Sequence, residues 1–169
     1  MKSGGNTFHK RLEAHMDELK WLYCELYHND ENAFRYFVEM LHRAYGQRSE
    51  VLRALDAARL ENPGWYRSND LLGMCLYTEQ FAGTLNGVRE KLSYLQEAGV
   101  NYLHLMPLLQ TVKGRSDGGY AVADFRRVQP ELGTMEDLEA LTAECHRRGM
   151  ACCLDFVMKI GRASCRERV

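Results

Sequence analysis

The sequence lacks any long hydrophobic run. No uninterrupted apolar stretch approaches the roughly 20 residues that a membrane-spanning helix needs. Residues 1–15 contain no apolar segment behind Lys2, so they do not resemble a secretory signal. These two absences predict a cytoplasmic protein with no membrane partner.

An excess of charge of one sign is also lacking. The 169 residues carry 22 basic and 23 acidic side chains, a formal net charge of −1. A nearly neutral chain gives no reason to expect a nucleic-acid partner. Hydrophobic residues make up 46% and charged residues 27%, which excludes disorder and is typical of an ordinary globular protein.

Cysteine pairs with metal-ligand spacing are missing. None of the six cysteines forms a C-x-x-C motif, and no histidine has zinc-ligand spacing to two of them. We therefore expect no metal site, and we expect mostly buried thiols in a reducing compartment. The six are Cys24, Cys75, Cys145, Cys152, Cys153 and Cys165.

Helical periodicity dominates the first 70 residues. Apolar side chains recur three and four positions apart, which is typical of amphipathic helices. The pattern predicts a helix over 8–26, a second from Asn29 or Asp30 to Gly46, and a third that Ser49 caps before Pro63-Gly64.

The pattern changes after residue 70 to short apolar runs that alternate with helices. Runs at 71–77, 100–106 and 150–158 predict buried strands. Thr84 and Thr134 open the intervening helices, the second with Asp137 as a capping-box partner. Strands that alternate with helices in this way predict an α/β fold with a parallel sheet.

A long polar loop, 108–133, contains the most informative cluster, GRSDGGYAVAD at 114–124. Its glycines allow a sharp turn, which would bring Asp117 and Tyr120 together at the carboxyl edge of the sheet. A carboxylate beside an aromatic ring suits a sugar ligand. The alternative is an Asx-type turn with a packed tyrosine.

Two further polar residues lie in the apolar strands. Asp155 needs partners if it is buried, and it is either structural or part of a site. His104 is more typical of a hydrogen-bonded core histidine than of a ligand, and we expect Glu79 to be solvated. The sequence has no zincin motif, no G-x-S-x-G elbow and no phosphate-binding glycine loop.

Three segments resemble the opening of the catalytic barrel of glycoside hydrolase family 13, the α-amylase superfamily. They are LYTEQFAGTLNGVREKLSYLQEAGVNYLHLMPLL, SDGGYAVADFRRVQPELGTMEDLEAL and MACCLDFVM. Within the family, YLHLMPLL followed by SDGGYAV resembles the amylosucrase branch, as does the helical lead-in. The resemblance covers residues 8–158. It departs at Thr78-Glu79, where a hydrophobic residue and Asp are expected.

The resemblance implies the first three strands of a (β/α)₈ barrel, over 71–158, preceded by an all-α helical domain over 1–70. It also implies retaining glucosyl transfer from sucrose to an α-1,4-glucan, with release of fructose and without a cofactor. Tyr120 would stack on the donor glucosyl ring, and Asp117 would lie at the closed end of the pocket. Asp155 would have a supporting role in the signature Asp-x-x-x-Asn-His.

The signature breaks at Lys159 and Ile160, where the family has Asn and His. The family's nucleophile and acid/base come from later strands, so the resemblance implies a fragment that contains no catalytic residue and is inactive alone. The tail 159–169, KIGRASCRERV, resembles the translation of a DNA-sequencing adapter, the alternative being a natural basic tail. Without it the chain has 18 basic and 22 acidic residues.

Two groups of alternatives remain open at the level of sequence. Within the enzyme class, the parent protein could be a sucrose hydrolase, a sucrose phosphorylase, an α-glucosidase or an α-amylase. From a different class, the chain could be a non-catalytic helical interaction module. The module reading predicts that the 169-residue chain folds stably alone, whereas the first three strands of an unclosed barrel predict aggregation or partial unfolding.

Overall fold

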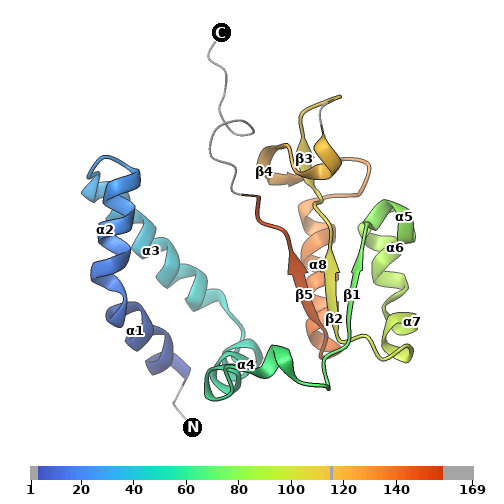
Figure 1. Cartoon of the computed structure of the whole chain (residues 1–169), viewed down its shortest axis with the longest axis horizontal. Helices are drawn as coiled ribbons and strands as arrows, with labels where there is room; N and C mark the ends of the chain where they lie inside the picture. The colour runs from blue at the N-terminus through green and yellow to red at the C-terminus, as the bar shows by residue number, and fades with distance from the viewer. Residues whose placement is uncertain (1–3, 115, 158–169) are drawn as a thin grey trace. The chain divides into compact units, whose positions relative to one another are not determined.

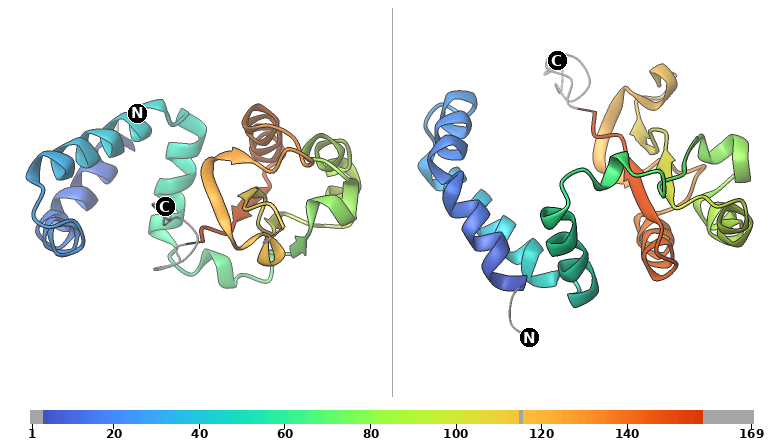
Figure 2. Two further views of the ribbon diagram at one scale, coloured as in Figure 1. Left: turned by 90° about the horizontal axis from the view of Figure 1, so that it is seen from above. Right: turned by 60° about the horizontal axis from the view of Figure 1, so that its bottom comes forward.

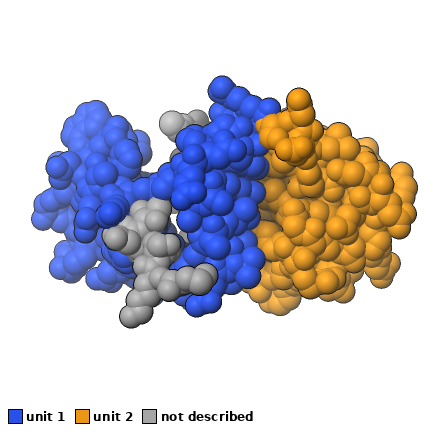
Figure 3. All heavy atoms as spheres, turned by 90° about the horizontal axis from the view of Figure 1, so that it is seen from below, with its two compact units in different colours: residues 1–67 blue, residues 68–169 orange. Residues whose placement is uncertain are grey.

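The computed structural model describes residues 4–114 and 116–157, with side chains from residue 8 onward. Contacts divide the chain into a helical unit, Met1–Arg67, and a sheet unit, Ser68–Val169, which Figure 3 colours separately. The tail 159–169 lies outside the described residues.

Four α-helices form the helical unit, and side-chain caps fix two of their starts. They are α1 (Gly4–Ala14), α2 (Met16–Leu26), α3 (Glu31–Gln47) and α4 (Glu50–Glu61), followed by the short 3₁₀ helix η1 (Trp65–Arg67). Asp30 accepts from the Ala33 amide and Ser49 from the Leu52 amide, which confirms the predicted starts of α3 and α4.

Two helix boundaries in this unit differ from the predictions. The single helix expected over 8–26 is broken at His15, whose ψ of 7° lies outside the helical range. Gly46 does not end α3, which continues through Gln47. The apolar spacing runs on through both positions, so periodicity alone does not reveal where the backbone changes direction.

Three parallel strands form the main sheet of the sheet unit, as predicted. They are β1 (Gly73–Leu76), β2 (Tyr102–Leu105) and β5 (Ala151–Leu154), in the order β1-β2-β5. This is a mixed helix–strand, partial barrel-like arrangement preceded by helices, which confirms the expected fold class. Figure 1 shows the three arrows pointing the same way.

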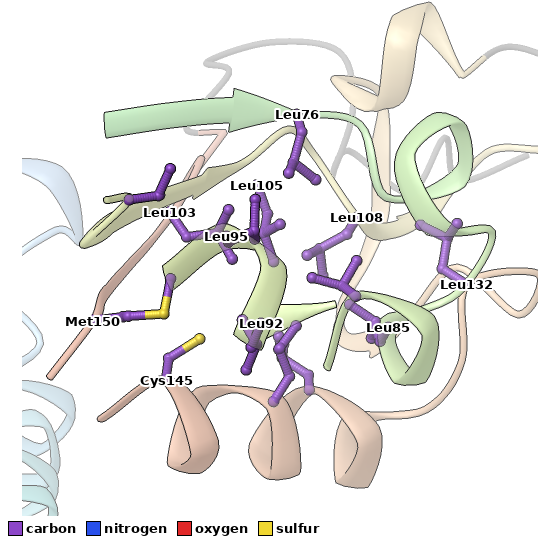
Figure 4. Close-up of a cluster of buried hydrophobic side chains, with 14 of the residues drawn as sticks. Leu76, Leu85, Leu92, Leu95, Leu103, Leu105, Leu108, Leu132, Cys145 and Met150 are labelled. Carbon is purple, nitrogen blue, oxygen red and sulfur yellow. The ribbon is translucent and has the colours of Figure 1, made fainter. Parts of the chain in front are cut away.

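Helices cover one face of this sheet. The helices α6 (Leu85–Glu90), α7 (Leu92–Glu97) and α8 (Met135–Arg147) pack their leucines against the strands, and Figures 1 and 2 place them on the same side. The core in Figure 4 includes Leu92, Leu95, Leu103, Leu105 and Cys145. Thr134 and Asp137 form the predicted capping box at the start of α8.

The long loop between β2 and α8 is more ordered than the sequence predicts. It contains β3 (Leu109–Thr111), the 3₁₀ turn η2 (Asp117–Gly119) and β4 (Val122–Val128), with β3 and β4 antiparallel. Figure 1 places these elements beyond the carboxyl ends of the parallel strands. A short helix, α5 (Thr78–Ala82), was also not predicted, and the helix expected after Thr84 is interrupted at Lys91 between α6 and α7.

The second face of the sheet is not covered by any described helix of the sheet unit itself. Side chains alternate along a strand, so the buried leucines of β2 leave His104 on the opposite face, in register with Cys75 and Cys153. Cys75 is exposed for this reason, which corrects the expectation of buried thiols; Cys145 is buried, and Cys24, Cys152 and Cys153 are half-buried. Cys165 lies outside the described residues. No helix in the described ranges is long and apolar enough to cross a bilayer.

Candidate functional site

The carboxyl edge of the parallel sheet gathers three polar side chains from distant parts of the chain. His104 of β2 is in register with Cys153 of β5. Asp155 lies two residues beyond Cys153, so its side chain returns to the same face. This geometry places the Asp155 carboxylate beside the His104 ring.

Both oxygens of Asp155 are engaged. His104 Nε2 lies 3.0 Å from Asp155 Oδ1, and the Tyr120 hydroxyl donates to Asp155 Oδ2 over 3.1 Å. A carboxylate can only accept, so His104 donates through Nε2. The side chains of His104 and Asp155 are 30% and 26% exposed, so the pair is half-buried at an open edge.

The turn η2 positions Tyr120. The Tyr120 amide donates to the Asp117 carbonyl over 3.1 Å, and the Ala121 amide donates to the Ser116 carbonyl over 3.0 Å. Gly119 has a φ of +93°, and a Cβ there would lie 2.9 Å from both the Cβ and the carbonyl oxygen of Pro107. A glycine is therefore required for the turn to pass this close to the end of β2.

Asp117 lies at the start of the same turn, as predicted. Its φ is +50°, a conformation that an aspartate tolerates better than most residues, and its side chain is exposed. The structure thus brings Asp117 and Tyr120 into one turn and brings Tyr120 onto Asp155. Each of these three candidate residues belongs to this edge of the sheet.

His104 is the member of the cluster that sequence reasoning set aside. Spacing gave no reason to pair it with Asp155, because 51 residues separate them. The contact depends on the register of β2 with β5, and none of the four residues of β5 is buried, so the sequence pattern does not reveal that register.

The cluster is built to hold a hydroxyl and a ring in place. The hydrogen bond to Asp155 raises the pKa of Tyr120 above its ordinary value, with burial and the negative charge of Asp155 acting in the same direction. Tyr120 therefore stays a neutral phenol, and its ring is fixed at the site. Asp155 thus holds both neighbours, with one oxygen on His104 and the other on Tyr120.

A pocket of about 540 Å³ also adjoins the turn. It is bordered by Gly118 and Gly119 of η2, by Tyr77 and Glu79 near α5, and by Gln129 after β4. Glu79 is exposed, as expected, and also borders this pocket. Within 4–114 and 116–157, no three His, Cys, Asp or Glu side chains are grouped so that they could hold a metal ion.

The family model for the α-amylase catalytic domain matches residues 65–160. α-Amylase SusG of Bacteroides thetaiotaomicron is 45% identical over 76 residues, which are 45% of this chain and 10% of that protein. Trehalose synthase of Pimelobacter sp. is 38% identical over 103 residues, or 58% of this chain and 18% of that protein.

Solved structures also resemble part of this chain. Isomaltulose synthase SmuA from Protaminobacter rubrum is 29% identical with a TM-score of 0.49, over 53% of this chain and 17% of that one. The chain spans 10% and 18% of the two curated relatives above, less than a fifth of their length.

Proposed function

Because this chain belongs to the α-amylase catalytic-domain family, we propose that it is the opening part of an enzyme acting on α-glucosides. We propose further that the complete enzyme retains anomeric configuration and transfers glucosyl units from sucrose to an α-1,4-glucan, releasing fructose, as in the amylosucrase branch of glycoside hydrolase family 13. No cofactor takes part in this reaction.

The observation that carries the proposal is the position of Tyr120. Its ring stands at the carboxyl edge of a parallel sheet, where α/β enzymes bind their ligands, and Asp155 holds its hydroxyl at 3.1 Å. A fixed aromatic face beside acidic side chains suits a glucosyl ring, whose C–H face is apolar and whose rim carries hydroxyls.

In this proposal the three site residues have separate roles. Tyr120 supplies the stacking surface for the donor ring, and Asp117 accepts from sugar hydroxyls at the closed end of the donor-sugar pocket that the complete barrel would form. Asp155 positions Tyr120 and His104. The nucleophile and the acid/base belong to strands beyond residue 158, so the chain alone turns over no glucoside.

The proposal extends to the organisation of the chain. Residues 1–70 form a helical domain, 71–158 form the start of the barrel, and the tail 159–169 is adapter-derived. Genomic sequence beyond codon 158 tests this directly. We expect Asn and His at the next two positions, followed by three acidic residues at the ends of later strands; a genomic sequence that encodes Lys159 and Ile160 contradicts it.

The activity is tested by assaying the complete enzyme on sucrose, maltose, trehalose and starch. We expect fructose release from sucrose together with glucan growth, without added phosphate. Release of equal glucose and fructose with no glucan would indicate a sucrose hydrolase, and dependence on phosphate a sucrose phosphorylase. Turnover of only maltose or starch would indicate an α-glucosidase or α-amylase.

The interaction-module alternative makes the opposite prediction for the same assay. If the helical unit served only to bind a partner and the barrel were degenerate, the complete protein would turn over none of the four glucosides. Any turnover of sucrose rejects this alternative.

A further inference from the structure

The helical unit contains a pocket of its own, remote in sequence from the site at the sheet. Its volume is about 610 Å³, and its walls come from α1, the end of α3, α4 and the segment that leads into η1. The matched catalytic-domain segment begins only at residue 65. All of its lining residues except Trp65 precede that segment, so the pocket belongs almost entirely to a part of the chain outside the matched catalytic domain.

Positive charge is in excess around this pocket. Arg11, Arg53 and Arg59 line it, and Asp56 is the one acidic side chain among its described lining residues. Asp56 is already paired with Arg48, whose Nη2 donates to Asp56 Oδ1 over 2.7 Å. That pairing lowers the pKa of Asp56, with Arg59 and Arg11 adding smaller contributions.

One of these arginines has an unused donor. Arg53 Nη2 donates to the Tyr45 and Gly46 carbonyls near the end of α3, over 3.0 and 2.8 Å. Arg53 Nε is shielded from solvent and has no acceptor among the described residues. A shielded guanidinium donor without an acceptor is unfavourable, and an incoming oxyanion would satisfy it.

Aromatic rings hold the guanidinium groups in place and form the apolar walls. The Arg59 guanidinium carbon lies 3.9 Å from the centre of the Trp65 ring, and that of Arg53 lies 4.8 Å from the Tyr45 ring. Phe8 stacks on Tyr45 with 4.3 Å between ring centres. These contacts fix the cations in place for an anionic group, and Leu12, Leu60 and Pro63 of the same lining offer apolar surface to a ligand ring.

We propose that this pocket binds a small ring compound that carries a phosphate monoester, either a sugar phosphate or a nucleoside monophosphate. A pocket of about 610 Å³ has the size typical of small-molecule sites. A phosphate monoester supplies the two negative charges and the several acceptor oxygens that three guanidinium groups call for. The site is independent of glucosyl transfer, and its ligand is not a substrate.

Binding is measured on the full chain by ligand-observed NMR titration, which needs only dilute protein. The probes are glucose 6-phosphate and AMP, with glucose, adenosine and inorganic phosphate for comparison. We expect at least one ester to bind tenfold more tightly than its neutral counterpart and than inorganic phosphate. The ester that binds more tightly shows whether the pocket takes a sugar phosphate or a nucleoside monophosphate. If neither ester exceeds its neutral counterpart, or if inorganic phosphate binds as tightly as both, the proposal is wrong.

Two variants locate the binding. Arg11→Gln and Arg59→Gln each remove one charge from the pocket and are expected to weaken ester binding at least tenfold. Arg11 has no side-chain hydrogen bond or ion pair recorded among the described residues, so its variant is expected to fold normally even if the Arg59 variant does not. Circular dichroism checks the helix content of both.

Arg35→Gln is the matched control. Arg35 lies on α3 outside the pocket and donates to Asn32 over 3.1 Å. This variant removes the same charge from the same unit and is expected to leave ester binding unchanged. Equal weakening by all three substitutions would indicate non-specific attraction to a basic surface, and unchanged binding in Arg11→Gln would place the ligand elsewhere; both outcomes overturn the proposal.

Discussion

Tyr120 is held at two points, by its amide in the turn η2 and by its hydroxyl on Asp155. Replacing the residue by alanine removes the proposed stacking surface. We expect Tyr120→Ala to lower kcat/KM for sucrose in the complete enzyme by about 100-fold, because misplacing the donor ring costs that much. Tyr120→Phe keeps the ring and loses only the hydrogen bond, so its loss is expected to be smaller, about tenfold.

Tyr94 provides the control for this pair of substitutions. It lies on α7 and is 62% exposed, so Tyr94→Ala removes a ring without touching the site. Initial rates of fructose release, measured over a range of sucrose concentrations, separate the variants. Unchanged kinetics in Tyr120→Ala would refute the stacking role.

Gly119 and Gly114 both have a positive φ, but only Gly114 has room around it for a side chain. A Cβ at Gly119 would meet Pro107 at 2.9 Å, whereas nothing lies within 4 Å of a Cβ at Gly114, and both have positive φ. We expect Gly114→Ala to lower the free energy of unfolding of the complete enzyme by about 1–2 kcal/mol from backbone strain alone. Gly119→Ala should cost roughly 1–3 kcal/mol more through the collision. Urea unfolding measures both; equal losses would mean that Pro107 moves aside freely.

At the scale of elements, the starts of helices were the most predictable feature. Ser49 and Thr134 act as caps because each side chain bonds to an amide three residues ahead, a relation that a short stretch of sequence contains in full. The same holds for Asp117 and Tyr120, which share one turn. These features depend on neighbours along the chain and not on the rest of the fold.

The features that were missed depend on pairing between distant segments. The sequence predicts a loop in place of the hairpin of β3 and β4, because β4 carries Asp124, Arg126 and Arg127 and buries only Val122 and Val128. The contact between His104 and Asp155 requires the register of β2 with β5, which no local pattern gives. The part of the site that was predicted from sequence is thus the part formed within one turn.

The end of α8 carries an ion cluster that makes stability depend on pH. Hydrogen bonds from Arg147 and Arg148 lower the pKa of Glu144 from 4.5 to about 2. A lowered pKa stabilises the folded state above pH 4.5, and this contribution is lost as the pH falls toward 2. We expect Glu144→Gln to lower the thermal midpoint of the complete enzyme by a few degrees at pH 7 and to have little effect near pH 2.

Glu139→Gln is the control, because Glu139 is an exposed residue of the same helix. Thermal melts followed by circular dichroism at a series of pH values give both midpoints. If the two variants behave alike at pH 7, the arginine contacts of Glu144 contribute nothing to the stability of α8.

At the scale of the whole molecule, the sheet has two open edges and one open face. β1 and β5 each pair on one side only within the described residues, and no described helix of the sheet unit covers the face that carries Cys75 and His104. In a closed barrel, further strands pair with such edges and the inner face is filled by side chains. Unpaired edges favour association with other chains.

These open surfaces predict how the 169-residue chain behaves by itself. We expect it to bind a hydrophobic dye, to self-associate as its concentration rises and to release no fructose from sucrose, because in the proposed enzyme the strands that close the sheet and supply the acids follow residue 158. Dye fluorescence, sedimentation velocity and a sucrose assay check the three parts.

A chain extended through the later strands of the proposed enzyme should lose dye binding and gain sucrose turnover together, because the strands that close the barrel also supply the catalytic acids. A monomer that melts cooperatively without binding dye would show that three strands and their helices suffice for a stable domain.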